Sequence, residues 1–307
     1  MSELRTTVGS VELPNPVLTA SGTAGHGAEL GRYFPLERLG AVVVKSLSAD
    51  PWPGNAAPRV HEATAGMLNS VGLQGPGVRA WLEHELPSLL ETRARVVASI
   101  WGRSVEDFEA AAKLLAGAPA GVVAIEVNLS CPNLDGGRHL FAQSEVATAE
   151  VIGAVVAALD RPVWAKLTAS VTSITAIARA AVDAGAEALT LINTMLGMAI
   201  DVETRRYRLG SGAGGGGLSG PAIHPIAVRA VHDVHASMPS TPIVGVGGVT
   251  SGVDAVELLL AGASAVQVGT ATFADPRAPV RVLEQLEDWC ARHGVGSVAE
   301  IIGGVHG

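Results

Sequence analysis

The chain has 307 residues, 48% of them hydrophobic and 16% charged, a composition that supports a large core and excludes an intrinsically disordered protein. Its formal net charge is −8 and its basic residues are scattered, which argues against a surface for nucleic acid or anionic membranes. Two cysteines are too few for a disulfide framework, a four-ligand zinc site or an iron–sulfur cluster, so any such centre would belong to another chain.

The first residues, Met1 to Arg5, lack the basic-then-apolar pattern of a signal peptide. No apolar run reaches the length of a membrane span. We therefore expect a cytoplasmic protein. Since no linker divides the sequence, we also expect a single domain over residues 1–307.

The segment from Thr6 to Leu13 alternates around Gly9-Ser10 and predicts a small hairpin. Eight short apolar runs follow, and polar residues, glycine or proline bound each of them, as is typical of buried parallel strands. These runs are Val17 to Ala20, Ala41 to Lys45, Val96 to Ile100, Val122 to Asn128, Val163 to Lys166, Ala188 to Ile192, Ile243 to Val246 and Ala265 to Val268.

Helical patterns lie between the runs, and several begin with serine or proline, as helix starts do. The clearest are Ser104 to Leu115, Ser144 to Leu159, Ser173 to Ala184, Pro221 to Ser237 and Ser251 to Ala261. Eight strands that alternate with helices predict an α/β fold of the (β/α)₈ TIM-barrel type. Such a barrel takes about 250 residues, which leaves room for the N-terminal hairpin and inserted loops. A doubly wound open sheet is the structural alternative.

Two segments are predicted to be insertions over the carboxyl face of the barrel, where they could act as mobile lids. They are Asp50 to Ala65, rich in proline and alanine, and Met198 to Gly217, which ends in a glycine run. Within the second, Gly210 to Gly215 matches a dinucleotide-binding fingerprint but follows no predicted strand, so we expect a flexible loop. His232 and His235 have a spacing found in metal sites, yet a solvated helix face explains them better.

Cys131 follows the predicted strand that ends at Asn128, and lies among polar residues that include Ser130 and Asn133. A free cysteine is often an inert buried residue, and this alternative stands on the thiol alone. An inert thiol has no need of neighbouring amides, whereas a polar planar ligand requires such donors and acceptors. The segment is therefore a candidate site with a reactive thiol.

Polar residues end most of the predicted strands, which is where TIM-barrel enzymes place their chemistry. Lys45 and Lys166 each follow an apolar strand, and we expect them to face a bound anion or an electron-rich ring; the alternative is that they extend to water. Gly247-Gly248 and Gly269-Thr270 end the last two strands, where a phosphate can bind backbone N–H groups. Tight turns alone are the alternative for these glycines.

Taken together, these segments resemble the dihydroorotate dehydrogenases, specifically the soluble class 1 enzymes, over nearly the whole chain. The resemblance rests on Ala20 to Gly22, Val44 to Ser46, Met67 to Gln74, Asn128 to Asn133, Asn193-Thr194, Leu218 to Ile223 and Ala261 to Thr270.

The resemblance implies a flavin enzyme that uses FMN to oxidise (S)-dihydroorotate to orotate in de novo pyrimidine (UMP) synthesis. Cys131 would be the catalytic base and would remove the C5 proton while hydride passes from C6 to flavin N5. Class 2 members use serine in this role. Because an unperturbed thiol has a pKa of about 8.5, activity is expected to rise as pH approaches that value.

The resemblance also implies two sets of binding residues. Lys45 would meet the substrate carboxylate, and Lys166 would lie by the N1/O2 edge of the flavin. The substrate set is Lys45, Asn69, Val71, Gly72, Leu73, Asn128, Asn133, Asn193 and Thr194. The FMN set is Ser21, Lys45, Ser46, Asn128, Lys166, Ile192, Gly220, Gly247, Gly248, Gly269 and Thr270. No metal ligand is implied.

The segment from Asn193 to Asp201 looks like the class 1B catalytic subunit, which passes electrons to NAD through a separate subunit with FAD and a 2Fe-2S cluster. A homodimer core with such a partner is the expected assembly. Ser99, Gly75 and Ala169-Ser170 depart from the usual family residues. Three alternatives remain: a class 1A enzyme that reduces fumarate, a flavin enzyme for another dihydropyrimidine such as dihydrouracil, and a non-redox phosphate-binding barrel.

Overall fold

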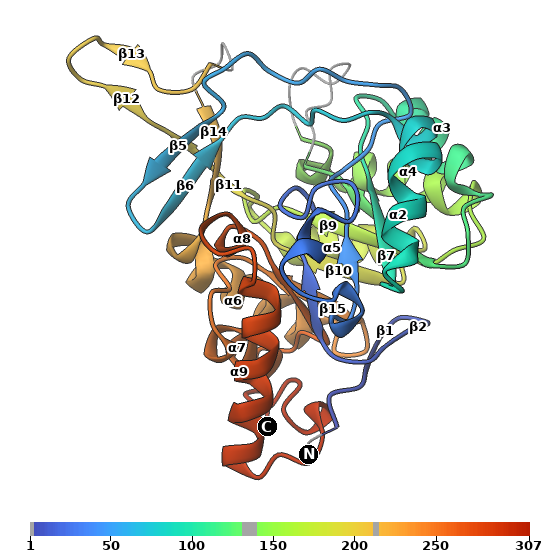
Figure 1. Ribbon diagram of the computed structural model, residues 1–307, viewed down its shortest axis with the longest axis vertical. Coiled ribbons are helices and arrows are strands. Elements are labelled where there is room, and N and C mark those ends of the chain that lie inside the picture. Colours follow the sequence, from blue (N-terminus) through green and yellow to red (C-terminus); the bar gives the residue numbers. More distant parts are fainter. Residues whose placement is uncertain (1–2, 131–139, 211–214) are drawn as a thin grey trace.

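The centre of the protein is a sheet of eight parallel strands, seen in a computed structural model that describes residues 3–130, 140–210 and 215–307 (Figure 1). The strands are β3 (Val17–Thr19), β4 (Val42–Val43), β7 (Val96–Ile100), β8 (Val122–Asn128), β9 (Val163–Leu167), β10 (Ala188–Leu191), β15 (Ile243–Val246) and β16 (Ala265–Val268). Their order in the sheet is β3-β16-β15-β10-β9-β8-β7-β4. Each strand coincides with one of the eight predicted runs, with β9 extending one residue further, to Leu167, so this part of the prediction is confirmed.

The sheet closes on itself between β3 and β4. Leu18 forms a parallel bridge with Ala41. The Thr19 hydroxyl oxygen accepts a hydrogen bond from the Val43 amide at 2.9 Å, and its hydroxyl lies 3.2 Å from the Val43 carbonyl. The threonine side chain thus continues the ladder where the strands are short. The fold is a (β/α)₈ barrel, and the doubly wound open sheet is wrong.

The barrel interior is apolar at one end and polar at the other. One buried apolar cluster takes a residue from each strand: Leu18, Val43, Val97, Ala124, Trp164, Ala188, Val244 and Ala265. Because side chains alternate along a strand, the residues two positions later face the same interior. That next layer includes Lys45, Ser99, Glu126, Lys166, Thr190 and Gln267. Polar groups therefore gather toward the carboxyl ends of the strands.

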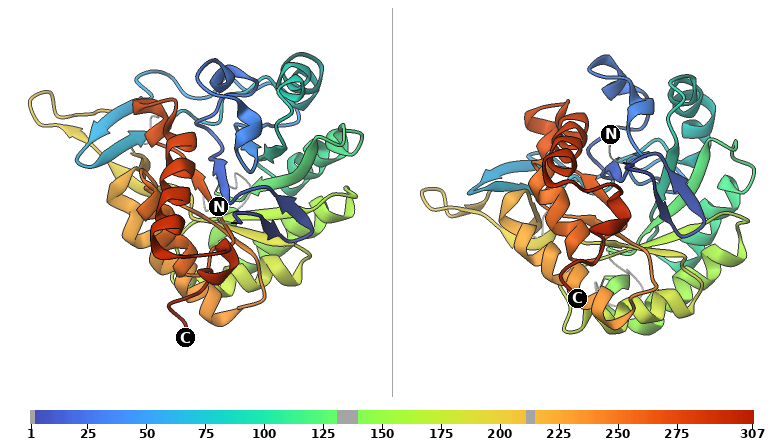
Figure 2. Two further views of the ribbon diagram at one scale, coloured as in Figure 1. Left: turned by 60° about the horizontal axis from the view of Figure 1, so that its bottom comes forward. Right: turned by 90° about the horizontal axis from the view of Figure 1, so that it is seen from below.

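The predicted N-terminal hairpin is present and covers the apolar end of the barrel. Its strands, β1 (Thr6–Val8) and β2 (Val11–Leu13), pair in antiparallel fashion. Val8, Val11 and Leu13 join the interior apolar cluster. In the view from below, the hairpin lies across this end of the barrel (Figure 2). Access to the interior is thus left to the opposite end.

Helices surround the barrel. They are α1 (Val78–Ala80), α2 (Leu86–Glu91), α3 (Val105–Leu115), α4 (Glu145–Ala157), α5 (Ile174–Asp183), α6 (His224–Ser237), α7 (Gly252–Leu260), α8 (Ala271–Ala274) and α9 (Ala278–His293), with a π-helical turn (Trp81–Glu85) between α1 and α2. Short 3-10 helices occupy Glu29–Arg32, Leu36–Arg38, Phe141–Gln143, Pro221–Ile223 and Val298–Glu300. Within the described ranges, no helix combines the length and apolar character that crossing a bilayer requires.

The five predicted helical patterns are confirmed. Four of these helices begin at a serine whose side chain accepts a hydrogen bond from a backbone amide of the first turn, as N-capping requires. The capping residues are Ser104, Ser144, Ser173 and Ser251. The fifth pattern begins as the 3-10 turn Pro221–Ile223 and continues as α6.

Segments within and directly beside the two predicted insertions meet in a four-stranded antiparallel sheet, which we call the upper sheet. Its strands are β5 (Val60–Ala63), β6 (Gly66–Asn69), β11 (Met195–Met198) and β14 (Gly215–Ser219), in the order β11-β14-β6-β5. A hairpin of β12 (Ile200–Asp201) and β13 (Arg206–Tyr207) projects beside it, away from β1 and β2 (Figure 1).

The expectation of a flexible loop from Gly210 to Gly215 is wrong at its end, since Gly215 begins β14; residues 211–214 lie outside the described residues. Glycine is required in β14 because its neighbours approach closely. A Cβ at Gly216 would lie 2.5 Å from the Asn69 carbonyl oxygen, and one at Gly217 would overlap the Thr194 hydroxyl. The interpretation of the two insertions as lids did not include this ordered sheet.

Candidate active site

A cavity of about 910 Å³ opens between the carboxyl end of the barrel and the upper sheet. This volume lies within the range of small-molecule and cofactor sites. Every predicted binding residue that the structure describes lines it: Ser21, Lys45, Ser46, Asn69, Val71, Gly72, Leu73, Asn128, Lys166, Ile192, Asn193, Thr194, Gly220, Gly247, Gly248, Gly269 and Thr270. Cys131 and Asn133 lie outside the described residues; Ser130, the residue before Cys131, lines the cavity.

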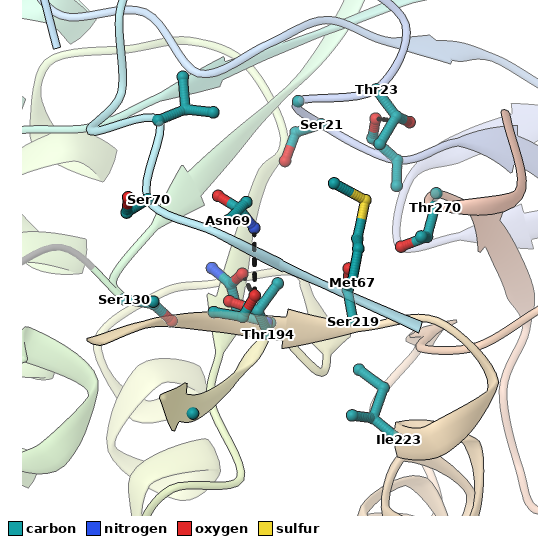
Figure 3. Close-up of a pocket in the computed structure, with 18 of the residues that line it drawn as sticks. Ser21, Thr23, Met67, Asn69, Ser70, Ser130, Thr194, Ser219, Ile223 and Thr270 are labelled. Atoms are coloured by element: carbon teal, nitrogen blue, oxygen red, sulfur yellow. Dashed lines mark hydrogen bonds between the residues drawn. The ribbon is translucent and has the colours of Figure 1, made fainter. Parts of the chain in front are cut away.

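The cavity has two distinguishable ends. In Figure 3, Ser130 and Thr194 lie toward one end, and Thr23, Thr270 and Ile223 lie toward the other. Strand β6 crosses the view and carries Met67 and Asn69. The amide-bearing residues therefore belong to a different part of the cavity from the end of β16.

Asn128 is fixed at the first end by a chain of hydrogen bonds. The Asn193 side-chain amide donates to Asn128 Oδ1 at 2.9 Å, and the Ser130 backbone amide donates to the same oxygen at 3.2 Å. Asn128 Nδ2 donates to Ser46 Oγ at 3.3 Å. The ends of three strands, β4, β8 and β10, thus supply one connected polar wall, which holds its donors and acceptors in place before a ligand binds.

Ser99 supports this wall from behind. It is fully buried, and its hydroxyl lies 2.9 Å from that of Ser46. Because Ser46 in turn accepts from Asn128, the departure from the usual family residue at Ser99 lies behind the cavity wall. Ser99 itself is not part of the lining.

The two lysines of the site have different surroundings. Lys166 is buried, and its Nζ donates to Ser21 Oγ at 3.1 Å and lies 3.6 Å from Glu126 Oε1. Lys45 lines the cavity, and burial together with the nearby Arg59 guanidinium lowers the pKa of Lys45 below its ordinary value. For Lys166, the alternative that the side chain extends to water is wrong.

Three glycines, which we call the glycine turn, form another wall of the cavity. Gly220, Gly247 and Gly248 have φ values of 97°, 141° and 68°, which disfavour any residue with a side chain. A Cβ at Gly248 would lie 2.7 Å from the His224 Cβ and 2.8 Å from the Gly220 carbonyl oxygen. The cavity is therefore lined here by backbone alone, as a site for a phosphate group requires.

His224 is a supporting residue that sequence reasoning missed. It is buried at the start of α6; Nδ1 lies 2.7 Å from the Gly247 carbonyl oxygen and Nε2 lies 3.1 Å from Glu257 Oε2. This pair of contacts holds the glycine turn against α6 and α7. The position of a histidine directly after Gly220 to Ile223 was the available signal.

Comparison with known proteins agrees with this geometry. The model of the family described as dihydroorotate dehydrogenase matches residues 3–289. A provisionally named dihydroorotate dehydrogenase A (fumarate) of Solibacter usitatus is 46% identical, with 98% of each chain covered. Proteins named dihydroorotate dehydrogenase B (NAD(+)), catalytic subunit, are 45% identical in Alkaliphilus metalliredigens, over 98% of each chain, and 44% identical in Geobacter sp. strain M21, over 98% of this chain and 97% of the relative. The chain belongs to the dihydroorotate dehydrogenase family.

Proposed function

We propose that this protein uses FMN to oxidise (S)-dihydroorotate to orotate, the redox step of de novo pyrimidine synthesis. The observation that carries the proposal is that one cavity joins the amides of Asn69, Asn128 and Asn193 to two lysines and a glycine turn. A planar ring with several amide groups and a carboxylate suits this set of donors and acceptors. A non-redox phosphate-binding barrel would leave the amides and lysines without a role.

The residues present fit FMN. The side-chain-free turn at Gly247 and Gly248 suits its phosphate, and the buried ammonium of Lys166 suits the edge of the ring that becomes electron-rich. The full proposed set is Ser21, Lys45, Ser46, Asn128, Lys166, Ile192, Gly220, Gly247, Gly248, Gly269 and Thr270. When bound, FMN supplies the capacity to accept the two electrons of the oxidation.

The chain's own residues bind and orient the substrate. Lys45 would pair with the carboxylate, because its ammonium lies in a partly dry cavity where a charge-assisted hydrogen bond is strong. The amides of Asn69, Asn128 and Asn193 would pair with the ring, together with Asn133. The remaining proposed substrate residues are Val71, Gly72, Leu73 and Thr194, which also line the cavity.

Cys131 is the proposed base, and its thiolate would take the proton from C5 of the substrate. Its neighbour Ser130 lines the cavity, and the Ser130 backbone amide is tied to Asn128. The chain therefore reaches the part of the cavity that Asn128 lines immediately before Cys131. This supports the assignment of Cys131 as the base.

An absorption spectrum tests the function directly. The purified protein should be yellow, with one FMN per chain, and dihydroorotate should bleach it under anaerobic conditions. Bleaching by dihydrouracil in place of dihydroorotate would instead support the enzyme of another dihydropyrimidine. A colourless protein that takes up no FMN on reconstitution would contradict the proposal and favour the non-redox barrel.

The glycine turn provides a prediction for cofactor binding. Gly248→Ala should lower the FMN content of the protein at least about tenfold, because the left-handed φ and the 2.7 Å approach to His224 force the turn to move. The measurement is the flavin-to-protein ratio after reconstitution. Gly153→Ala is the matched control: its Cβ meets nothing within 4 Å on α4, so FMN content should stay unchanged and stability should rise by about 0.5–1 kcal/mol. Normal FMN content in Gly248→Ala would remove the turn from the cofactor site.

We further propose that the electrons leave through a separate subunit with FAD and an iron–sulfur cluster, as in class 1B, with a homodimer of this chain at the core. Two cysteines in the whole chain support a cluster on another polypeptide. The names of the relatives above include both the NAD-linked and the fumarate-linked type. Co-purification with such a flavoprotein would support class 1B, whereas efficient fumarate reduction by this chain alone would assign class 1A.

A further inference from the structure

Glu126 is a fully buried carboxylate in the barrel interior whose position the proposed reaction does not explain. It lies on β8, two residues after Ala124 of the apolar interior cluster and two before Asn128 of the cavity wall. Glu126 is not among the residues that line the cavity. Since a buried carboxylate is costly unless its surroundings compensate it, its contacts indicate what it does.

Those contacts lead to Lys166. Glu126 Oε2 accepts from Gln267 Nε2 at 2.8 Å and from Thr190 Oγ1 at 3.2 Å. Its other oxygen, Oε1, lies 3.6 Å from Lys166 Nζ and has no hydrogen-bond partner among the described residues. Glu126 Oε1 therefore interacts with the positive charge of the Lys166 ammonium.

The same ammonium is held from the cavity side. Lys166 Nζ donates to Ser21 Oγ at 3.1 Å and lies 3.5 Å from Gln267 Oε1. The side-chain amide of Gln267 thus contacts both members of the ion pair: its nitrogen donates to Glu126 and its oxygen accepts from Lys166. A lysine stem is flexible and its ammonium has no preferred direction, so Glu126, Gln267 and Ser21 together determine where the charge sits.

The arrangement also sets how strongly that charge acts on a ligand. Opposite charges about 4 Å apart interact far more strongly in a buried site than in water. Lys166 and Ser21 line the cavity, while Glu126 lies behind them. The carboxylate thus offsets part of the positive potential that Lys166 projects toward the cavity.

We propose that Glu126 is a positioning residue that acts through Lys166 to set the reduction potential of the bound flavin. It holds the ammonium at the cavity wall and limits the stabilisation that this charge gives to the reduced ring. This inference rests on the proposed function, because it requires FMN in the cavity. A purely structural ion pair would be a weak explanation, since buried ion pairs often stabilise a fold no better than apolar residues of similar volume.

Glu126→Gln tests the proposal, because it removes the charge and keeps the size. The flavin equilibrium, measured against a redox dye of known potential, should shift about tenfold toward the reduced form, which is about 30 mV for a two-electron couple. In a Lys166→Met background the same change should shift the equilibrium less than about twofold, since coupled residues are not additive. Equal shifts in both backgrounds would show that Glu126 does not act through Lys166 and would overturn the proposal.

Two further variants separate this role from a structural one. Thr190→Val removes an uncharged donor from the same carboxylate but leaves its charge, so it should lower the melting temperature while shifting the flavin equilibrium less than about twofold. Glu126→Asp keeps the charge but withdraws it by one methylene, so a shift of about threefold in the direction of Glu126→Gln is expected. It serves as the test if Glu126→Gln fails to fold. Lower stability without any flavin shift in the Glu126 variants would overturn the proposal.

The wild-type protein separates this inference from the function on which it rests. Protein that binds no FMN would end the proposed function. Protein that binds FMN and is bleached by dihydroorotate, but whose potential is the same with and without the Glu126 charge, would end only the role of Glu126.

Discussion

Cys131→Ala is expected to slow the reduction of bound FMN by dihydroorotate about 10²- to 10⁴-fold, the usual contribution of a general base, while the protein stays yellow. The loss arises because no other group would be positioned to take the C5 proton in concert with hydride transfer. Stopped-flow absorbance under anaerobic conditions measures this single turnover without the electron acceptor. In the unmodified protein the rate should rise with pH toward the ordinary thiol pKa of about 8.5.

The second cysteine supplies the matched control. Cys290 is fully buried in α9, and burial raises the pKa of its thiol. Cys290→Ala should leave the reduction rate unchanged and lower stability by about 1 kcal/mol, the typical cost of a small core truncation. Cys131→Ser replaces the thiol with a hydroxyl, a weaker acid in the same place, and should give a rate between those of the wild type and Cys131→Ala. A Cys131→Ala protein that is reduced at the normal rate would remove Cys131 from the role of base.

The barrel could be predicted because its strands are buried on both faces, which makes each a continuous apolar run that ends in a polar residue. Besides the short helix α8, two longer helical regions were not predicted. The region Val78–Glu91 contains Pro87 and a π-helical turn, which break the helical periodicity of its apolar residues. Helix α9 has a regular helical pattern but was not among the predicted helices. Neither of these two helical regions contributes a residue to the cavity lining.

The upper sheet could not be predicted from local pattern. Strand β14 is a run of glycines at Gly215 to Gly217, and glycine has low intrinsic preference for strands. It becomes a strand because β6 and β11 flank it and leave no space for side chains. Strands β6 and β14 follow different strands of the barrel and are about 150 residues apart in the sequence, so only the closed barrel brings them together and the information is tertiary.

Within the site, the expectation that functional residues lie at the strand ends identified the residues that line the cavity. It did not identify the buried residues that hold them in place. Lys45, Asn128 and Lys166 lie at or within two residues of the carboxyl ends of their strands, where this expectation applies. Glu126 and Gln267 lie inside strands in the same interior layer as Lys166; neither lines the cavity, and both contact Lys166, which does. A charged residue within the apolar run Val122–Asn128, in phase with Asn128, was the signal available for Glu126.

Lys45→Met is expected to raise the KM for dihydroorotate about 100-fold, because a buried charge-assisted hydrogen bond contributes about 1.5–3 kcal/mol to binding. Lys45 is one of eleven residues in the proposed FMN set, and the other ten, including the glycine turn and Lys166, are unchanged, so most of the protein should still carry FMN. Steady-state kinetics with a dye as acceptor measures the effect. The loss should vanish for a substrate analogue that lacks the carboxylate, which separates the proposed ion pair from a general disturbance of the cavity.

Another lysine provides the control for this substitution. Lys45, Lys113 and Lys166 are the three lysines of the chain. Lys113 lies on α3, is largely exposed, and pairs with Glu109 at 2.7 Å. Lys113→Met removes the same charge from the protein as a whole and should leave KM unchanged, since exposed pairs contribute little. A similar rise in KM for both variants would attribute the effect to net charge and contradict the assignment of Lys45.

The pKa of Lys45 gives this prediction a pH dependence with a definite sign. Burial, and then the Arg59 guanidinium, disfavour the charged form, so in the free enzyme the ammonium loses its proton at a lower pH than an ordinary lysine. Because the carboxylate needs the charged form, kcat/KM should fall on the alkaline side as pH rises through that lowered value. Arg59→Gln removes one cause of the shift and should move the alkaline limb to higher pH. An alkaline limb that persists unchanged in Lys45→Met would assign it to another group.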